Sequence, residues 1–197
     1  MSRETDMTIE YYNQHADEYV ESTLYADMSD ARNKFLSYIP EGGTILDFGC
    51  GSGRDSKAFL DAGYKVTALD GSEELCKRAE RLLNQPVQCC LFQDYKAEEQ
   101  FDGIWACATL LHLKKEELES VIEQLVKSLK PDGVLYMSFK YGEFSGERDG
   151  RWFTDLEVLP DTLYGPLIQE TWISLDVREG TKTQKWYNVI SKKSPAN

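Results

Sequence analysis

From Thr44 onward, short apolar runs alternate with amphipathic segments, and this alternation limits the possible folds more than any other feature. The pattern is typical of a parallel sheet whose strands are joined by crossover helices. Strands are expected at 44–48, 65–69, 87–92, 103–108 and 134–139. With a C-terminal hairpin described below, the sequence predicts an α/β fold, with a doubly wound, mostly parallel seven-stranded sheet and helices on both faces.

Two segments between these strands have helical periodicity. Apolar residues recur at three- and four-residue spacing in 75–83 and again in 118–129, as expected for helices with one buried face. Ser72 stands where an N-cap is expected, with two glutamates after it, and Pro131–Asp132–Gly133 is expected to stop the second helix. Both segments are therefore predicted to be crossover helices.

The regions outside this alternation have other patterns. Apolar residues within 12–20 and 31–39 predict two leading helices. The segment 140–151 is rich in glycine and charge and is expected to be a loop. Since no repeat, low-complexity tract or linker divides the chain, we expect one domain over 1–197.

The last part of the chain carries two β-like runs. Ile168–Val177 and Gln184–Ser191 flank Arg178–Glu179–Gly180–Thr181. Two such runs joined by a short polar segment are typical of a β-hairpin. The sequence therefore predicts a terminal antiparallel hairpin.

The net charge and the lengths of the apolar runs indicate which partners and which location to expect. The chain has 34 acidic and 22 basic side chains, a formal charge of -12. Nucleic-acid affinity depends largely on Lys and Arg that displace counterions, so bulk binding to DNA or RNA is disfavoured. No apolar run approaches the ~20 residues that cross a bilayer, and the start lacks a signal-peptide pattern. We therefore expect a cytoplasmic protein without nucleic-acid or membrane partners.

The cysteine pattern disfavours both disulfides and a metal centre. The five cysteines are Cys50, Cys76, Cys89, Cys90 and Cys107. Their number is odd and none forms a C-x-x-C pair, so neither a disulfide framework nor a zinc site is expected. Cys89 and Cys90 are neighbours on a predicted strand and would point to opposite faces. We expect all five to be reduced and buried.

The segment Ile45–Asp55 carries the chemistry of the chain. It is a buried strand that leads into a glycine-rich turn, G-x-G-x-G at Gly49, Gly51 and Gly53, and then into a helix. Such a turn lets a ligand lie against bare backbone. Asp70 ends the next strand, where a carboxylate can accept hydrogen bonds from a ribose diol. Together these features indicate an adenosine ligand at the carboxyl ends of the strands.

Three adenosine ligands fit this architecture, namely NAD, FAD and S-adenosylmethionine. The glycine spacing is one residue shorter than the dinucleotide fingerprint G-x-G-x-x-G. Asp47 would also lie close to a pyrophosphate, and at ~4 Å with an effective dielectric near 20 such repulsion costs ~4 kcal/mol. The ammonium and sulfonium of S-adenosylmethionine would be attracted instead. A role for Asp47 as a cap of the loop is compatible with either kind of ligand.

With these features, Ile45–Asp55 resembles motif I of the class I S-adenosylmethionine-dependent methyltransferases. The resemblance implies that the three glycines approach the methionine part, that Asp70 binds the ribose beside Gly71, and that Asp94 with the backbone of Tyr95 reads the adenine. A leading helix with the pattern Tyr-Tyr-x(n)-Ala-x-x-Tyr also resembles the cover helix of small-molecule methyltransferases. The residues that these resemblances assign to the cofactor are Tyr12, Tyr19, Asp47, Gly49, Cys50, Gly51, Gly53, Arg54, Asp70, Gly71, Asp94, Tyr95 and Ala106.

Later segments extend the resemblance. Phe101–Ala106 is similar to the fourth-strand motif, whose end passes beside the methionine moiety. Lys130–Pro131–Asp132–Gly133 is similar to the family's K-P-G-G turn, with Asp132 in place of the first glycine. Gly53–Ser56 resembles the tellurite-resistance methyltransferases. The resemblance implies S-adenosylmethionine as cofactor and S-adenosylhomocysteine as product.

Methyl transfer requires alignment of the nucleophile with the methyl carbon more than it requires a particular catalytic residue. A base is needed only when the acceptor must lose a proton. His112 lies on a loop at the active edge of the sheet and is a candidate acid, base or acceptor contact. It could equally cap the helix that begins near Lys114. His15, on the leading helix, is expected to be a half-exposed surface residue.

The leading aromatic residues Tyr11, Tyr12, Tyr19 and Tyr25 have two interpretations. They could be packing residues without a further role. We favour a lid over 1–40 that closes over the cofactor, with Tyr12 or Tyr19 at the methionine end. In this interpretation 44–139 forms the cofactor-binding core and 140–197 the acceptor-side loop and hairpin.

The segment after the fifth strand could border an acceptor. Its candidate substrate residues are Lys140, Tyr141, Arg148, Arg151 and Trp152, which could hold an anionic or planar molecule. The alternative is a solvated loop whose cations neutralise the neighbouring acidic side chains.

Four functions remain open from the sequence. Methylation of a small molecule is favoured because no large acceptor-recognition domain is visible. The alternatives are a tRNA or protein methyltransferase, a non-catalytic S-adenosylmethionine-binding protein and a dinucleotide oxidoreductase. The N-P-P-Y type motif of amino-directed nucleic-acid enzymes is missing, because Ala108–Leu111 stands in its place.

Overall fold

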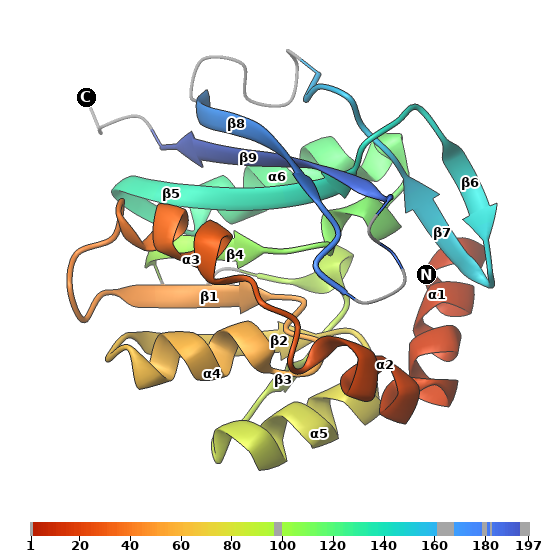
Figure 1. The fold of residues 1–197 in the computed structure, drawn as a ribbon, viewed down its shortest axis with the longest axis horizontal. Helices are drawn as coiled ribbons and strands as arrows, with labels where there is room; N and C mark the ends of the chain where they lie inside the picture. Colours follow the sequence, from red (N-terminus) through yellow and green to blue (C-terminus); the bar gives the residue numbers. More distant parts are fainter. Residues whose placement is uncertain (1, 97–99, 161–167, 179–180, 182, 194–197) are drawn as a thin grey trace.

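The structure is a computed structural model that describes residues 2–96, 100–160, 168–178, 181 and 183–193. Its main sheet has seven strands in the order β3-β2-β1-β4-β5-β9-β8 (Figure 1). The strands are β1 (Thr44–Phe48), β2 (Lys65–Asp70), β3 (Gln88–Cys89), β4 (Phe101–Ala106), β5 (Leu129–Lys140), β8 (Ile168–Leu175) and β9 (Lys185–Lys192). The first five run parallel, and β9 is antiparallel to both β5 and β8. The predicted fold class is confirmed.

Helices cover both faces of this sheet. The α-helices are α1 (Arg3–Gln14), α2 (Ala16–Thr23), α3 (Ser29–Leu36), α4 (Arg54–Asp61), α5 (Glu73–Leu83) and α6 (Lys115–Lys127), with 3₁₀ turns η1 (Phe92–Asp94) and η2 (Leu110–His112). Phe35 of α3 and Phe59 of α4 pack with Trp105 and Tyr136 on one face. The apolar side of α6 packs on the other face. In the parts of the chain that the structure describes, every helix is too short or too polar to span a bilayer.

The strand order reverses direction between β1 and β4. Strand β1 pairs with β2 on one side and with β4 on the other, all parallel. In open α/β sheets, ligands bind outside the carboxyl ends of the strands at such a switch point. The glycine-rich loop follows β1 at this position, so the fold places the predicted ligand loop where a crevice is expected.

Several predicted boundaries are confirmed and others are wrong. Ser72 caps α5, because its Oγ accepts the N–H of Leu75. The third strand, predicted over 87–92, has only two residues because it lies at the sheet edge and the chain turns into η1. Helix α6 ends at Lys127, before the proline predicted to stop it.

The other predicted boundaries shift with local pairing. Strand β5 begins at Leu129 and therefore includes the predicted turn, where Asp132 has φ 64°. A register irregularity opposite this turn lets β4 begin at Phe101 and end at Ala106, two residues earlier than predicted at each end.

The leading region forms three helices rather than the two predicted. The break between α1 and α2 falls at His15, whose ring stacks on Tyr11 and whose Nδ1 hydrogen bonds to the Tyr11 carbonyl at 2.9 Å. Because that carbonyl lies in the last turn of α1, the side chain helps to end the helix. The predicted half-exposed position of His15 is confirmed.

The expectation of a loop over 140–151 is wrong. The chain forms a hairpin there, β6 (Ser145–Arg148) and β7 (Arg151–Thr154), as a separate two-stranded sheet. Asp149 and Gly150 form the turn with φ of 52° and 74°. An Asp-Gly pair with positive φ at both positions is a strong hairpin signal, so the sequence contained the evidence for these strands.

Two further predictions have mixed outcomes. The C-terminal hairpin is confirmed as β8 and β9, while residues 179–180 of its predicted turn lie outside the described residues. The expectation that all five cysteines are buried is wrong. Cys89 is exposed, and Cys90 and Cys107 are half-buried. Cys89 and Cys90 lie where β3 ends on the sheet edge, and Cys107 follows the end of β4.

Candidate functional site

The loop between β1 and α4 is built on left-handed backbone. Gly49, Gly51 and Gly53 have φ of 85°, 55° and 79°, a region that side chains disfavour. The N–H groups of Gly49 and Cys50 both donate to the carbonyl of Leu69 at the end of β2. The loop is therefore fixed to the neighbouring strand.

Each of the three glycines also faces a different neighbour. A Cβ at Gly49 would lie 2.5 Å from the Thr109 side chain, and one at Gly51 would lie 3.0 Å from the Tyr19 ring. At Gly53 it would meet Ala79 of α5 at 3.3 Å. The structure thus places Gly53 in a helix contact, while Thr109 and Tyr19 lie directly against Gly49 and Gly51.

Asp70 joins the glycine loop to helix α5. Its buried carboxylate accepts the N–H of Gly51 and the N–H of Ser72, both at 2.9 Å. Burial raises the pKa of Asp70, although these backbone donors act in the opposite direction. The carboxylate is thus held at the carboxyl end of β2, at the position that the sequence predicts for a ribose contact.

The predicted adenine side is covered by α1. Asp94 is exposed on η1, and Tyr95 is buried against Phe48 with ring centroids 5.5 Å apart. A cavity of only about 20 Å³ lies beside Gly71, where Ile9 of α1 is 2.7 Å from the position of a Cβ. Helix α1 therefore packs directly against the strand end.

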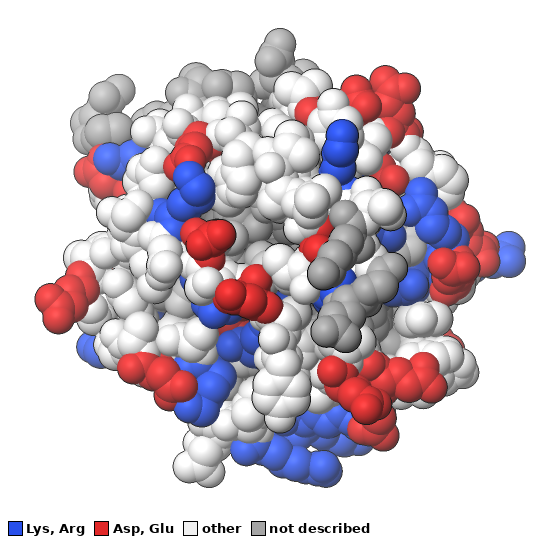
Figure 2. Space-filling model, in the orientation of Figure 1, with Lys and Arg blue, Asp and Glu red and all other residues white. Residues whose placement is uncertain are grey.

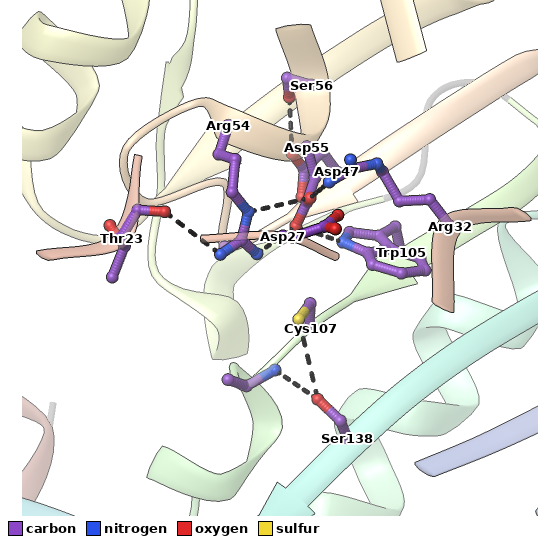
Figure 3. Close-up of polar contacts among 12 residues, drawn as sticks. Thr23, Asp27, Arg32, Asp47, Arg54, Asp55, Ser56, Trp105, Cys107 and Ser138 are labelled. Atoms are coloured by element: carbon purple, nitrogen blue, oxygen red, sulfur yellow. Dashed lines mark hydrogen bonds and ion pairs between the residues drawn. The ribbon is translucent and has the colours of Figure 1, made fainter. Parts of the chain in front are cut away.

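Two carboxylates lie next to each other beneath the glycine loop (Figure 3). Asp47 accepts a hydrogen bond of 2.6 Å from Ser56 Oγ. Burial and the neighbouring Asp55 raise the pKa of Asp47 to about 7. A cationic group at this site would stabilise the ionised form, so the position suits an ammonium better than a phosphate.

Asp55 is the partner of several donors, which Figure 3 shows converging on it. Arg54 donates from Nε at 3.0 Å and from Nη2 at 2.6 Å, and Arg32 donates at 2.7 Å. The indole N–H of Trp105 adds a fourth hydrogen bond at 3.0 Å. Burial alone would raise the pKa of Asp55, but the two guanidinium groups lower it below its usual value. Arg54 is thus fixed beside the loop.

Two cavities lie close to this loop. A loop cavity of about 20 Å³ contacts Asp47, Gly49 and Cys50. A second, large cavity of about 320 Å³ lies across the carboxyl ends of β4 and β5 and reaches β7 and the β8–β9 end. Both are lined by Tyr19, Thr23, Arg54 and Cys107. The two spaces are therefore neighbours.

His112 lines the large cavity in a fixed orientation. Its Nδ1 lies 2.7 Å from the Trp152 carbonyl oxygen, which can only accept, so this nitrogen carries a proton. Its Nε2 then accepts from the Tyr12 hydroxyl at 2.8 Å. Burial, with smaller contributions from Arg151 and Lys140, lowers the pKa of His112 to about 4. The imidazole is therefore neutral at ordinary pH, and one nitrogen faces Tyr12.

The alternative role of His112, as a cap of helix α6, is not what the structure shows. The N-cap residue is Lys114, whose N–H hydrogen bonds to Glu117.

The candidate substrate residues divide into two groups. Lys140 and Arg151 line the large cavity. Arg148 pairs with Asp155 at 3.2 Å, Tyr141 is exposed, and Trp152 packs under Lys114. These last three do not line the cavity.

Sequence reasoning missed the contribution of the C-terminal hairpin. Asp176, Arg178 and Trp186 line the large cavity, and Asp176 accepts from both other side chains. Burial acts to raise the pKa of Asp176, but the Arg178 guanidinium lowers it to about 2. Ser138 of β5 and Asn188 of β9 were missed as well. Alternation along the strands predicts their burial but gives no signal of a cavity.

Comparisons with known proteins agree with this geometry. A family model described as a methyltransferase domain matches residues 45–133. The YqeM protein of Bacillus subtilis (strain 168), named as a methyltransferase, is 31% identical over 144 residues. That match covers 67% of this chain and 58% of YqeM, so the chain spans just over half of the relative's length.

Two further similarities extend over almost the whole chain. An uncharacterized methyltransferase of Staphylococcus carnosus (strain TM300) is 24% identical over 93% of this chain and 99% of its own. The 1,6-didemethyltoxoflavin-N1-methyltransferase of Burkholderia thailandensis, solved with its substrate and S-adenosylhomocysteine, matches with a TM-score of 0.75 and 20% identity. It covers 96% of this chain and 88% of that one. At this identity the structural match shows the fold alone.

Proposed function

The chain belongs to the class I S-adenosylmethionine-dependent methyltransferases, and we propose that it methylates a small molecule bound in the large cavity. Its cofactor is S-adenosylmethionine and its second product is S-adenosylhomocysteine. One observation carries the choice of acceptor site. Four residues line both the loop cavity and the large cavity, so a methyl donor on the glycine loop would face the larger space.

The residues present suit this cofactor. The loop cavity contacts Gly49 and Cys50, and Asp70 offers a fixed carboxylate for ribose hydroxyls. The raised pKa of Asp47 favours a site for the cofactor ammonium. When bound, S-adenosylmethionine supplies an electrophilic methyl group. The protein's task is to align the acceptor with that group and to exclude water.

The full set of proposed cofactor residues remains the one predicted by the family resemblance. Arg54, Cys50 and Tyr19 line the loop cavity, which supports their inclusion. Tyr12 lines the large cavity at its His112 end. The contribution of Gly53, which packs against α5, would be to the shape of the loop. The similarity of Gly53–Ser56 to the tellurite-resistance subfamily stays a prediction.

We further propose His112 as the proton acceptor of the reaction. Its neutral Nε2 lies at the cavity and is bonded to the Tyr12 hydroxyl. A proton that leaves the acceptor could pass to the Tyr12 oxygen while the Tyr12 proton passes to Nε2. The Trp152 carbonyl would continue to accept from Nδ1, which holds the ring in place for this transfer.

Helices α1 and α2 would act as a lid within the proposed 1–40 region. The Tyr19 ring lies on Gly51, and Ile9 lies against Gly71. A ligand on the strand ends must contact or displace these side chains. The core over 44–139 would then hold the cofactor, and 140–197 would complete the acceptor side.

Macromolecular acceptors are less well supported. On the face in Figure 2, basic side chains are interspersed with acidic ones, and the net charge is -12. Such a surface disfavours an RNA backbone. A non-catalytic S-adenosylmethionine-binding protein would need no second cavity, whereas a space of about 320 Å³ adjoins the loop here.

The proposal is tested with methyl-labelled S-adenosylmethionine and cell lysate separated into small-molecule, protein and RNA fractions. We expect label in the small-molecule fraction with the unmodified protein and with a Lys185→Met variant, which changes an exposed side chain outside the cavity. Label in RNA or protein, or no transfer to any fraction by a protein that binds the cofactor, would contradict the proposal.

A further inference from the structure

We propose that the acceptor carries an anionic group, a carboxylate or a phosphate monoester, which Arg151 and Lys140 bind inside the large cavity. This inference rests on the proposed function and specifies its substrate class. The anionic group would anchor the molecule and would not be the methylated atom.

Arg151 and Lys140 differ in their ion pairing from the other cationic side chains that line the large cavity. Arg54 pairs with Asp55 at 2.6 Å, and Arg178 pairs with Asp176 at 2.6 Å. Among the residues that the structure describes, Arg151 and Lys140 have no carboxylate within ion-pair distance. The Nε of Arg151 is buried and lacks a hydrogen-bond partner in the same described set. Such a buried donor is costly unless a ligand satisfies it.

Both cations flank one aromatic ring. Lys140 Nζ lies 4.1 Å from the centroid of Phe153, and the Arg151 guanidinium carbon lies 5.1 Å from the same centroid. Burial, together with the positive charges of Arg148 and Arg151, lowers the pKa of Lys140 and outweighs the opposite effect of the Asp155 carboxylate. Like charges gathered in a partly buried space repel each other. A bound anion would remove this repulsion.

The Arg151 side chain is also held by aromatic packing. Its guanidinium carbon lies 4.2 Å from the centroid of Tyr11 and 5.7 Å from that of Tyr12. A planar guanidinium fixed against a ring keeps its donor fork in one orientation, which suits two-point binding of carboxylate or phosphate oxygens. The site therefore has positive charge, an unsatisfied buried donor at Arg151 Nε and a fixed geometry.

The proposed anion site shares its cavity with the proposed proton acceptor. Arg151 and Lys140 line the same cavity as His112 and contribute to the low pKa of that imidazole. An anion bound to both cations would offset this effect and make His112 a stronger base. Binding of the correct acceptor would thus improve the proposed proton acceptor.

The test uses aromatic probes that differ in charge, and benzamide is the neutral counterpart of benzoate with the same shape. Benzoate, benzamide and phenyl phosphate are titrated into the S-adenosylhomocysteine-saturated protein, with binding followed by ligand-observed NMR and calorimetry. We expect benzoate or phenyl phosphate to bind at least about tenfold more tightly than benzamide. Arg151→Met and Lys140→Met should each remove most of this preference, while Lys185→Met should keep it. The stronger of the two anions distinguishes a carboxylate from a phosphate acceptor.

Thermal unfolding shows whether each variant folds, and Arg151→Lys serves as a second variant that keeps the charge. It should retain part of the preference. Equal binding of benzoate, phenyl phosphate and benzamide would overturn the inference, as would an anion preference unchanged in folded Arg151→Met and Lys140→Met proteins. The titrations are repeated without S-adenosylhomocysteine, so a failure of cofactor binding is seen separately from a failure of anion binding.

Discussion

The hydroxyl of Tyr12 donates a 2.8 Å hydrogen bond to Nε2 of His112, and this bond joins helix α1 to the 3₁₀ turn that follows β4. One residue belongs to the proposed lid and the other to the active edge of the sheet. Closure of the proposed lid would therefore also orient the proposed base.

Replacement of His112 tests its role as proton acceptor. We expect His112→Ala to lower kcat by about 10²–10⁴-fold, the usual contribution of a general base, and to leave the affinity for S-adenosylhomocysteine nearly unchanged. Tyr12→Phe should also slow turnover because it interrupts the proton path. Single-turnover rates and calorimetry measure these effects. Full activity of His112→Ala would reduce the residue to a structural role.

The pH profile provides an independent check on His112. Because its pKa is lowered to about 4, the imidazole is neutral and basic at every pH well above that value. The unmodified enzyme should therefore show no loss of kcat/KM from this group between about pH 6 and 8, because kcat/KM reports the protein before the acceptor binds. A fall of kcat/KM with an apparent pKa near 6.5 that disappears in His112→Ala would contradict this assignment.

The ionised Asp47 carboxylate is expected to lower the free energy of unfolding and to strengthen cofactor binding. Its pKa of about 7 lies above the unfolded value, so the folded state retains a proton and stability is lost as the pH rises from about 4 through 7. Asp47→Asn should raise the free energy of unfolding by roughly 1–4 kcal/mol at pH 8 and by less at pH 5. The same variant should bind S-adenosylmethionine more weakly.

Chemical denaturation at the two pH values measures the stability effect, and calorimetry measures the affinity. A stability gain at pH 5 that equals or exceeds the gain at pH 8 would contradict the raised pKa. Stronger cofactor binding by Asp47→Asn would contradict its position near the ammonium.

Asp70→Ala should weaken cofactor binding by about 1.5–3 kcal/mol, the worth of hydrogen bonds to a charged acceptor. The carboxylate also tethers Gly51 and Ser72, so the variant needs a control of similar structural cost. Asp102→Ala removes a carboxylate bonded to Thr44 and Lys130, at the opposite end of the strands. Calorimetry should show weaker binding only for Asp70→Ala, and equal affinities of the two variants would refute the ribose contact.

The first helices should respond to the cofactor. Hydrogen exchange of residues 3–23 is expected to slow when S-adenosylhomocysteine binds, because Tyr19 and Ile9 lie over the loop and the strand end. Residues 185–192 of β9 should change much less. Exchange in residues 3–23 that is the same with and without the ligand would argue against a lid.

The parts of the fold that depend on local sequence were predicted well. The apolar run of β1, the glycines after it and the cap at Ser72 are decided by neighbouring residues, so periodicity and capping rules apply directly. The predicted length of the third strand was wrong because it depends on pairing at a sheet edge. The hairpin at 145–154 was missed although Asp149–Gly150 is a strong turn signal.

In the candidate site, too, the residues with a local sequence pattern could be predicted, and their partners could not. Asp70 and Gly49 follow a known spacing, but the partnership of Tyr12 and His112 joins residues 100 positions apart. Pairing of Arg54 with Asp55 and of Arg178 with Asp176 decides which cations remain for a ligand. Such pairings depend on tertiary packing, and the amino-acid pattern alone could not reveal them.

The central claim is that the cofactor loop and the large cavity form one reaction site. A crystal structure with S-adenosylhomocysteine tests it most directly. The account predicts that the ligand lies on Gly49 and Gly51 with its sulfur facing the large cavity between Tyr19 and Cys107. A sulfur that faces bulk solvent or the α5 side, away from this cavity, would contradict the account.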